Sequence, residues 1–214
     1  MSRRPTARWW SLAEGSCWTL AVIALAAWAA LHLAAGAGAR YELYRFAVLE
    51  AAQMGTGTPD QSLWSAVRIK AWQSAMNAPA PPPLGVLRIP RLQLEAPLLA
   101  GTDEATLDRG LGHIEDTAVP GGEGGNVGIA GHRDGFFRVL KDIAEGDVIE
   151  IQTLAGKDVY RVQRTWIVEP DDVSVLDPTP TRALTLVTCY PFYFVGSAPQ
   201  RFIVRAVSVG NTQQ

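Results

Sequence analysis

The pattern of hydrophobic and polar positions changes at Leu84 to short runs rich in β-forming residues, separated by clusters of Gly, Pro and Asp. This pattern is typical of strands joined by turns. We expect strands at 86–89, 96–99, 126–131, 148–154 and 159–168, then one that ends on Cys189 and one that opens on Arg201. Two segments, 102–109 and 135–140, have the composition of helical turns, and Asp134 is a natural N-cap for the second. About seven or eight strands within roughly 130 residues are typical of a sandwich or a barrel, so the sequence predicts an all-β domain.

A different pattern occupies the N-terminus. Residues 15–39 contain no Asp, Glu, Lys or Arg, and arginines stand at positions 3, 4 and 8 before this run. A helix of roughly 20 apolar residues crosses the hydrocarbon core of a bilayer, and flanking arginines favour the cytoplasmic side. We therefore expect a single-pass signal anchor at 15–39 in the inner or cytoplasmic membrane, with residues 1–14 in the cytoplasm and the remainder outside it. The alternative is a cleaved signal peptide, because Ala37-Gly38-Ala39 is an acceptable cleavage tripeptide.

The segment between the apolar run and the strands, residues 40–83, has a helical pattern. One helix is expected over 41–54, and Asp60 is a natural N-cap for a second helix that runs to Met76. The larger apolar residues of the second helix fall to one side: Trp64, Val67, Ala71 and Trp72. A solvated spacer and a helix docked on the following domain are both compatible with this pattern, and the two tryptophans favour docking.

Composition sets the remaining boundaries. Four prolines lie between positions 78 and 83, which is typical of a semi-rigid linker. We therefore place the β-rich domain at 84–210, with a short tail at 211–214. The chain has 214 residues, with 19 Lys and Arg against 21 Asp and Glu, so no strong positive field would attract nucleic acid.

The two cysteines lie in different environments. Cys17 falls inside the apolar run, and Cys189 falls far along the polar part of the chain. If the apolar run lies in a bilayer, the two cannot meet as a disulfide. Cys189 is then a free thiol in an exported domain, which requires a chemical explanation.

Alternation along the last two strands places Cys189 beside a cation. Cys189 shares a strand face with Thr185, and Arg201 at the start of the next strand shares a face with Arg205. His132 follows the strand at 126–131, where glycines at 128 and 131 indicate a close backbone approach. A buried structural cysteine and a structural histidine are the commoner fates of such residues. Together, an imidazole and a guanidinium would favour the nucleophilic thiolate, although spacing alone leaves open whether the three groups converge.

Three segments resemble the sortase family. Thr185-Leu-Val-Thr-Cys189 is similar to the Thr-Leu-x-Thr-Cys signature of these proteins. Gly131-His-Arg-Asp134, followed by Phe137, is similar to the segment that carries their catalytic histidine, and Arg201 matches their arginine. The resemblance spans 85–209 and is closest to the class D branch, including the versions found in Gram-negative bacteria.

The resemblance implies a closed β-barrel of about eight strands with the site at one end, and a cysteine transpeptidase without a cofactor. Cys189 would attack the carbonyl after Thr in a Leu-Pro-x-Thr-Gly sorting signal of a substrate protein, forming a thioacyl-enzyme. His132 would protonate the leaving amine and deprotonate the amine acceptor. Arg201 would stabilise the oxyanion, and is preferred to Arg205 because it stands at the strand start. Thr188 would help to position the substrate, or else it only packs.

Two links flank the cysteine, 169–183 and 190–200, and are expected to form the walls of the substrate groove. Apolar residues of the first link are candidates for a slot that takes the Leu-Pro part of the signal: Val173, Val175 and Leu176. Acidic pairs at 115–116 and 171–172 offer hard-cation ligands. A calcium site needs about six or more oxygens, so solvated acids are the better interpretation and no metal is assigned.

Two other function classes remain open from the sequence. An exported cysteine protease or amidase would use the same nucleophile and release an acid to water; a product joined to an added amine distinguishes the transpeptidase. A non-catalytic anchored β-domain that binds a partner would bury Cys189. Such a thiol would resist small alkylating reagents in the folded state.

Overall fold

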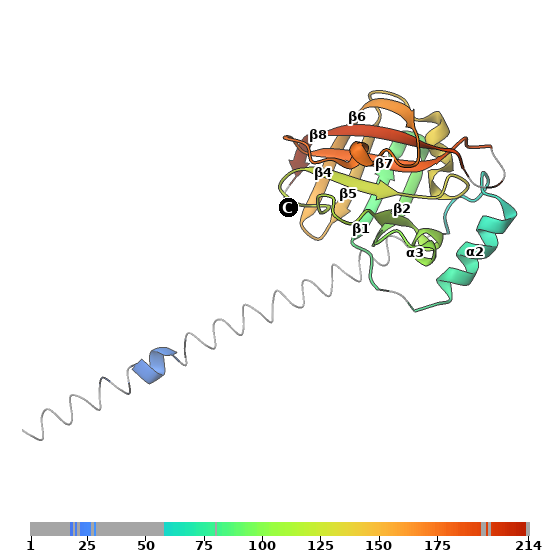
Figure 1. Cartoon of the computed structure of the whole chain (residues 1–214). Coiled ribbons are helices and arrows are strands. Elements are labelled where there is room, and N and C mark those ends of the chain that lie inside the picture. The colour runs from blue at the N-terminus through green and yellow to red at the C-terminus, as the bar shows by residue number, and fades with distance from the viewer. Residues whose placement is uncertain are drawn as a thin grey trace, which may run out of the picture. The chain divides into compact units, whose positions relative to one another are not determined.

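The computed structural model describes residues 18, 20, 22–26, 28, 58–79, 81–193, 196 and 198–212 (Figure 1). Contacts divide the chain into two compact units, Met1–Phe46 and Ala47–Gln214. In the part of the chain that the structure describes, no helix combines the length and the apolar character needed to cross a bilayer. Most of the anchor expected at 15–39, and the whole helix expected at 41–54, lie outside the described residues.

Eight strands of the second unit close into a barrel (Figure 1). They are β1 (Gly85–Ile89), β2 (Leu94–Ala100), β3 (Leu111–His113), β4 (Asn126–Ala130), β5 (Val148–Thr153), β6 (Gly156–Val168), β7 (Ala183–Tyr190) and β8 (Gln200–Thr212). The order around the barrel is β1-β2-β3-β4-β7-β8-β6-β5. The pairs β2–β3 and β4–β7 are parallel, and the other neighbouring pairs are antiparallel. The closed barrel confirms the all-β prediction and excludes the two-sheet sandwich.

The core of the barrel is built from the inward-facing residues of the strands. The larger of its fully buried aliphatic strand residues are Leu87, Ile89, Leu98, Leu111, Ile129, Ile149, Ile151, Leu184 and Leu186. The alternation expected along β7 is therefore observed, since Leu184 and Leu186 belong to this cluster. Along β8, Val204 and Ala206 belong to it as well. Because side chains alternate along a strand, Cys189 on β7 and Arg201 on β8 belong to the opposite face of the sheet from this cluster.

Short helical elements connect the strands. They are η1 (Pro90–Leu92), α3 (Glu104–Arg109), η2 (Phe136–Asp142) and η3 (Val173–Leu176). The elements α3 and η2 confirm the two helical turns expected from the sequence. Asp134 is not the N-cap of η2: Gly135 occupies that position without a side-chain hydrogen bond. The carboxylate of Asp134 instead accepts hydrogen bonds from Ser65 and Arg68.

The helix α2 (Ala66–Met76), which precedes the barrel in the chain, is docked on it. The ring of Trp64 packs edge-on against Phe136 with 4.8 Å between centroids, and both Trp64 and Trp72 contact the core. Docking, the alternative that the tryptophans favoured, is therefore confirmed. The predicted start and face need correction. The N-cap is Ser65 rather than Asp60, which instead accepts a bond from the backbone of Ser62, and Val67 is 79% exposed.

Candidate active site

Three neighbouring strands bring the predicted catalytic residues to one end of the barrel. In the parallel pair β4–β7, Ala130 is opposite Val187, and the backbone N–H of Gly131 donates to the Val187 carbonyl at 3.2 Å. Continuing this register sets His132 beside Cys189. In the antiparallel pair β7–β8, Cys189 is directly opposite Arg201. The thiol-bearing strand thus lies between the strand end that leads into His132 and the strand start that carries Arg201.

The backbone before His132 is fixed by close packing and by Thr188. A Cβ on Gly131 would lie 2.7 Å from a Phe137 ring carbon and 2.8 Å from a Leu111 methyl, which confirms the close approach expected there. Thr188 is 2% exposed, and its Oγ1 donates a 2.8 Å hydrogen bond to the Gly131 carbonyl. The hydroxyl of Thr188 therefore ties β7 to the chain that leads into His132.

Cys189 is partly buried and has an aromatic neighbourhood. Tyr190, Phe192 and Phe202 form a cluster, with ring centroids 5.2 to 6.3 Å apart. Their packing joins the end of β7 to the start of β8 around the Cys189–Arg201 pair. Partial exposure of the thiol contrasts with the fully buried cysteine that the non-catalytic hypothesis requires.

Arg201 and Arg205 have different surroundings. Arg201 Nη1 donates to the carbonyls of Gln200 at 3.1 Å and Ala198 at 3.4 Å, and none of the described carboxylates forms a salt bridge with it. Arg205 is paired with Thr185 rather than with Cys189, and its Nη2 donates to the Val175 carbonyl at 2.8 Å. Four residues along a strand span about 13 Å, so the strand register puts Arg201, and not Arg205, at the thiol.

His132 is largely withdrawn from solvent. Its side chain is 17% exposed, and Nε2 is buried without a hydrogen-bond partner. Nε2 lies 3.6 Å from Glu104 Oε1 and 3.7 Å from Asp108 Oδ1. Burial and the positive charge of Arg68 lower the pKa of His132, and the nearby carboxylates only partly oppose this. The imidazole is therefore held in its neutral form at neutral pH.

Arg68 on α2 reaches the same cluster, and sequence reasoning missed it. Its Nε donates to Asp134 Oδ1 at 3.1 Å, and its Nη1 donates to Asp108 Oδ1. The signal was present in the spacing, because position 68 lies one helical turn from both Trp64 and Trp72. A cation on the tryptophan face of a docked helix lies against the domain, and a half-buried guanidinium there is a candidate for an ion pair with its carboxylates.

The link after β6 crosses the face that carries Cys189, at a distance from the thiol. The Val175 carbonyl accepts bonds from Asn126 at 3.2 Å and from Thr185 at 3.4 Å, at the opposite end of β4 and β7 from the site. Of the predicted substrate-binding residues in η3, Val173 is 68% exposed and Val175 is buried. Leu176 is partly buried and would lie 3.1 Å from a Cβ on Gly128.

The link after Cys189 is held by arginines from the His132 segment. Arg133 donates to the carbonyls of Pro191 at 3.2 Å and Gly196 at 2.6 Å. Arg138 donates to the Phe192 carbonyl, and its guanidinium lies 4.2 Å from the centroid of the Tyr193 ring. The chain that carries His132 therefore fixes the loop that follows the thiol.

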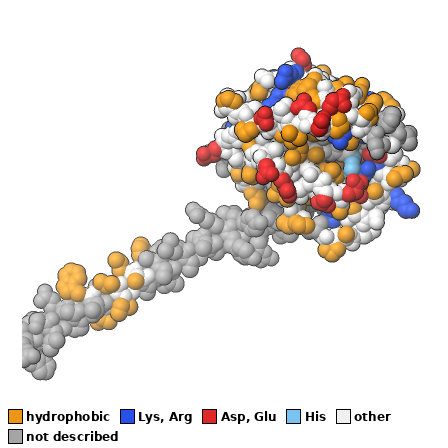
Figure 2. Space-filling view, in the orientation of Figure 1, with side chains coloured by type: hydrophobic (Ala, Val, Ile, Leu, Met, Phe, Trp, Pro, Cys, Tyr) orange, Lys and Arg blue, Asp and Glu red, His pale blue; other side chains and the backbone are white. Residues whose placement is uncertain are grey.

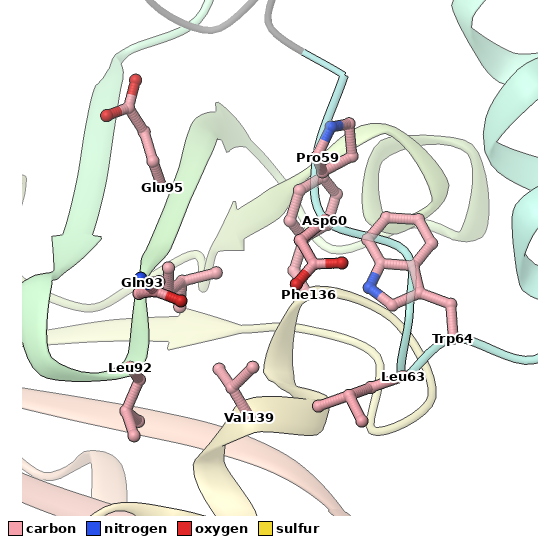
Figure 3. A pocket seen from close by; sticks show the side chains of 10 residues that line it. Pro59, Asp60, Leu63, Trp64, Leu92, Gln93, Glu95, Phe136 and Val139 are labelled. Carbon is pink, nitrogen blue, oxygen red and sulfur yellow. The ribbon is translucent and has the colours of Figure 1, made fainter.

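A pocket lies beside Trp64 rather than at the thiol (Figure 3). It opens between residues 59–64, the η1 turn and the η2 helix, with Leu63, Leu92 and Val139 around it. None of the predicted catalytic residues lines it. On the face shown in Figure 2, acidic, basic and hydrophobic side chains are interspersed over the barrel, in line with the balanced charge of the sequence.

One group of described residues has the composition of a metal site. Ligand atoms of Glu104, Asp108 and His132 lie within 4.8 Å of one another. The Arg68 guanidinium is bonded to Asp108 and is 3.7 Å from Glu104, so a cation of this chain already offsets part of the charge of the two carboxylates. We assign no metal to the group.

A closed barrel whose neighbouring strands bring a cysteine, a histidine and an arginine to one end has the parts of an acyl-transfer site with a cysteine nucleophile. A family model, the sortase domain, matches residues 87–209. The chain belongs to the sortase family, whose members are cysteine transpeptidases, and this confirms the resemblance found in the sequence.

Individual relatives support the assignment. Sortase D from Bacillus subtilis is 38% identical over 121 residues, which cover 56% of this chain and 61% of that protein. The structure of a lid mutant of sortase A from Corynebacterium diphtheriae matches with a TM-score of 0.57 at 29% identity, covering 68% of this chain and 95% of that one. Sortase E1 from Streptomyces coelicolor, solved with a tripeptide in its active site, matches with a TM-score of 0.56 at 31% identity, covering 61% and 90%. The chain is therefore a sortase with similarity to class D.

Proposed function

We propose that this protein is a membrane-anchored cysteine transpeptidase that cleaves a sorting signal of the Leu-Pro-x-Thr-Gly type and joins the cleaved protein to an amine acceptor. The observation that carries the proposal is the position of Cys189, between the strand end that leads into His132 and the strand start that carries Arg201. Membership of the sortase family supports the same chemistry.

In the first half-reaction, the sulfur of Cys189 attacks the carbonyl carbon of the threonine in the signal, at its peptide bond to glycine. The thiol proton passes to His132. A neutral imidazole accepts such a proton, and the lowered pKa of His132 keeps it neutral. The bond from the carbonyl carbon to the amide nitrogen then breaks. His132 gives its proton to the leaving amine, and a thioester remains on Cys189.

Arg201 supplies the charge that this step needs. The carbonyl oxygen becomes an oxyanion when the thiol adds, and a guanidinium offers five N–H donors in a planar fork. One nitrogen of Arg201 is held by the carbonyls of Ala198 and Gln200, which orients the group opposite the thiol. Among the described residues these two carbonyls are its hydrogen-bond partners, and the other guanidinium donors would bind the substrate oxygen.

In the second half-reaction, an acceptor amine attacks the thioester carbonyl and loses a proton to His132. The carbon–sulfur bond breaks, and the Cys189 thiolate recovers the proton from His132. Attack by water in place of the amine would give an acid, which is the product of the protease alternative.

The link at 169–183 forms the wall that receives the Leu-Pro part of the signal. Val173 and Leu176 contact the substrate, and Val175 supports the wall from beneath because its side chain is buried. Thr188, whose hydroxyl is bonded to Gly131, acts on the substrate through the position of His132.

The test uses the full-length chain, a mixture of candidate signal peptides and an added amine, with mass spectrometry of protein and peptides. We expect a thioacyl adduct on Cys189 with one class of peptide, and a product joined to the amine. Cys189→Ala should give neither while remaining folded, since it removes only a sulfur at a strand end. Turnover by the alanine variant would refute the nucleophile, and hydrolysed peptide alone would favour the protease.

Anchoring is a separate part of the proposal and is supported by the uncharged run at 15–39 behind three arginines. The full chain should fractionate with membranes at its uncut mass, with the barrel accessible from the non-cytoplasmic side. A mature protein that begins at Arg40 would show instead that the run is a cleaved signal peptide.

A further inference from the structure

Arg68 and His132 face the same carboxylate oxygen atoms. Asp108 Oδ1 is hydrogen-bonded by Arg68 Nη1 and lies 3.7 Å from His132 Nε2. Glu104 Oε1 lies 3.7 Å from Arg68 Nη1 and 3.6 Å from His132 Nε2. Arg68 holds the nearer position at Asp108, and Nε2 of His132 has no hydrogen-bond partner in the described structure.

Arg68 is fixed by contacts that do not involve the histidine. Its backbone N–H donates to the side chain of Ser65, the N-cap of α2, and the Ser65 hydroxyl donates to Asp134 Oδ2 at 3.0 Å. Asp134 Oδ1 in turn accepts from Arg68 Nε. The Arg68 side chain is 14% exposed, so solvent screens these bonds weakly. A planar fork bonds Asp108 and Asp134 at once, which a lysine ammonium does less well.

We propose that Arg68, from the helix that precedes the barrel, is a positioning residue of the active site. Because it occupies Asp108 and Asp134, it prevents these carboxylates from binding the imidazole of His132. The ring is then free to exchange protons with the thiol and the amines. This inference rests on the proposed function for its catalytic meaning. Its electrostatic part is measurable without a substrate.

The charged groups around His132 determine what the loss of Arg68 does. Glu104 and Asp108 face the ring from α3, Asp134 follows it in the chain, and Cys189 and Arg201 lie on the neighbouring strands. Without Arg68, three carboxylates face one imidazole and no cation of α2 offsets them. The protonated ring would gain an ion pair with Asp108, so the pKa of His132 would rise.

The direct test is the titration of His132 followed by imidazole NMR in the full-length chain, with the signal assigned from its loss in His132→Gln. Arg68→Gln should move the titration to higher pH than in the wild-type chain. Lys70→Gln is the matched control, because it removes the same charge from an exposed position of α2 and should leave the titration unchanged. Arg68→Lys keeps the charge without the fork and should fall between the two.

A second variant separates electrostatics from undocking of α2. Arg68→Gln with Asp108→Asn removes both the cation and the carboxylate that it occupies, so the titration should return toward the wild-type position. The rate of thioester formation is also measured for each variant between about pH 5 and pH 9. The acidic limb of this pH–rate profile should shift between variants in the same order as the titration of His132. An unchanged titration in Arg68→Gln, or a double variant that resembles the single one, would overturn the inference. Turnover by Cys189→Ala would refute the proposed function and leave the titration result intact.

Discussion

Replacing Thr188 by valine separates a structural role from a role in substrate binding. The side chain lies directly before the nucleophile, is 2% exposed, and donates a 2.8 Å hydrogen bond to the Gly131 carbonyl. Valine has nearly the same shape and no hydroxyl. Thr188→Val therefore removes the bond that ties β7 to the chain leading into His132, and it leaves the packing almost intact.

The expected magnitude follows from the burial of this bond. A buried polar group that loses its partner costs about 1–3 kcal/mol, so the free energy of unfolding should fall by about that amount. Thr188→Ser keeps the hydroxyl and deletes one buried methyl group, for a cost of about 1 kcal/mol. Because the bond positions His132, valine should also lower kcat while KM changes little, and serine should retain most of kcat.

The assays are urea unfolding of both variants and steady-state transpeptidation of a cognate signal peptide. The reasoning is refuted if Thr188→Val unfolds at the wild-type urea concentration. If both variants instead raise KM at unchanged stability, the hydroxyl or methyl of Thr188 contacts the substrate, and the residue returns to the substrate-binding set.

Two further predictions follow from the same strands. Arg201→Ala should lower the rate of thioester formation by about 100- to 1,000-fold, and Arg201→Lys nearly as much, because a point charge cannot replace the fork. Arg205→Ala should retain most of the activity, since Arg205 bonds Val175 instead; a crippled Arg205→Ala with a normal Arg201→Ala would show that the strand register is wrong. Far from the site, the hydrogen bond from Arg91 lowers the pKa of Asp147 below its ordinary value of 3.8. This carboxylate therefore stabilises the fold above its unfolded pKa, and the contribution is lost as the pH falls through the folded pKa. Asp147→Asn should lower the free energy of unfolding at neutral pH. In a series of urea unfolding curves, the midpoint of this variant should fall less steeply as the pH becomes acidic. An unchanged acid dependence would contradict the assignment.

The strands and the three candidate catalytic residues were accessible from the sequence, because strand patterns and the motifs that resemble the sortase family are both local. Runs of β-forming residues between turn clusters identified seven of the eight strands, and period-two alternation gave the faces of β7 and β8. The missed strand, β3, has three residues with a central glycine, so it carries no readable alternation. The choice of Arg201 over Arg205 needed only the strand start, and the register with Cys189 agrees with it.

The parts that the sequence did not reveal depend on contacts between distant segments. Asp60 and Ser65 are equally good N-caps by residue type. Ser65 occupies the cap in the structure, where its hydroxyl also reaches Asp134, 69 positions away. Asp134 was expected to cap η2 and instead binds α2. In each case a long-range ion pair or hydrogen bond decides between local alternatives that propensity leaves nearly equal.

The folded domain that carries the candidate site begins before the first strand of the barrel, at helix α2. The proline-rich linker and the first strand suggest a boundary near Leu84, yet α2 is attached to the barrel along its whole length. Trp64 packs on Phe136 at its start, and Arg109 donates to the carbonyls of Ala75 at 3.1 Å and Ala78 at 2.8 Å at its end. Between these attachments, the helix supplies the Arg68 guanidinium, which pairs with the carboxylates near the imidazole. In the mechanism proposed above, the barrel supplies the thiol, the imidazole and the oxyanion donor, and the preceding helix adjusts the charge around the imidazole.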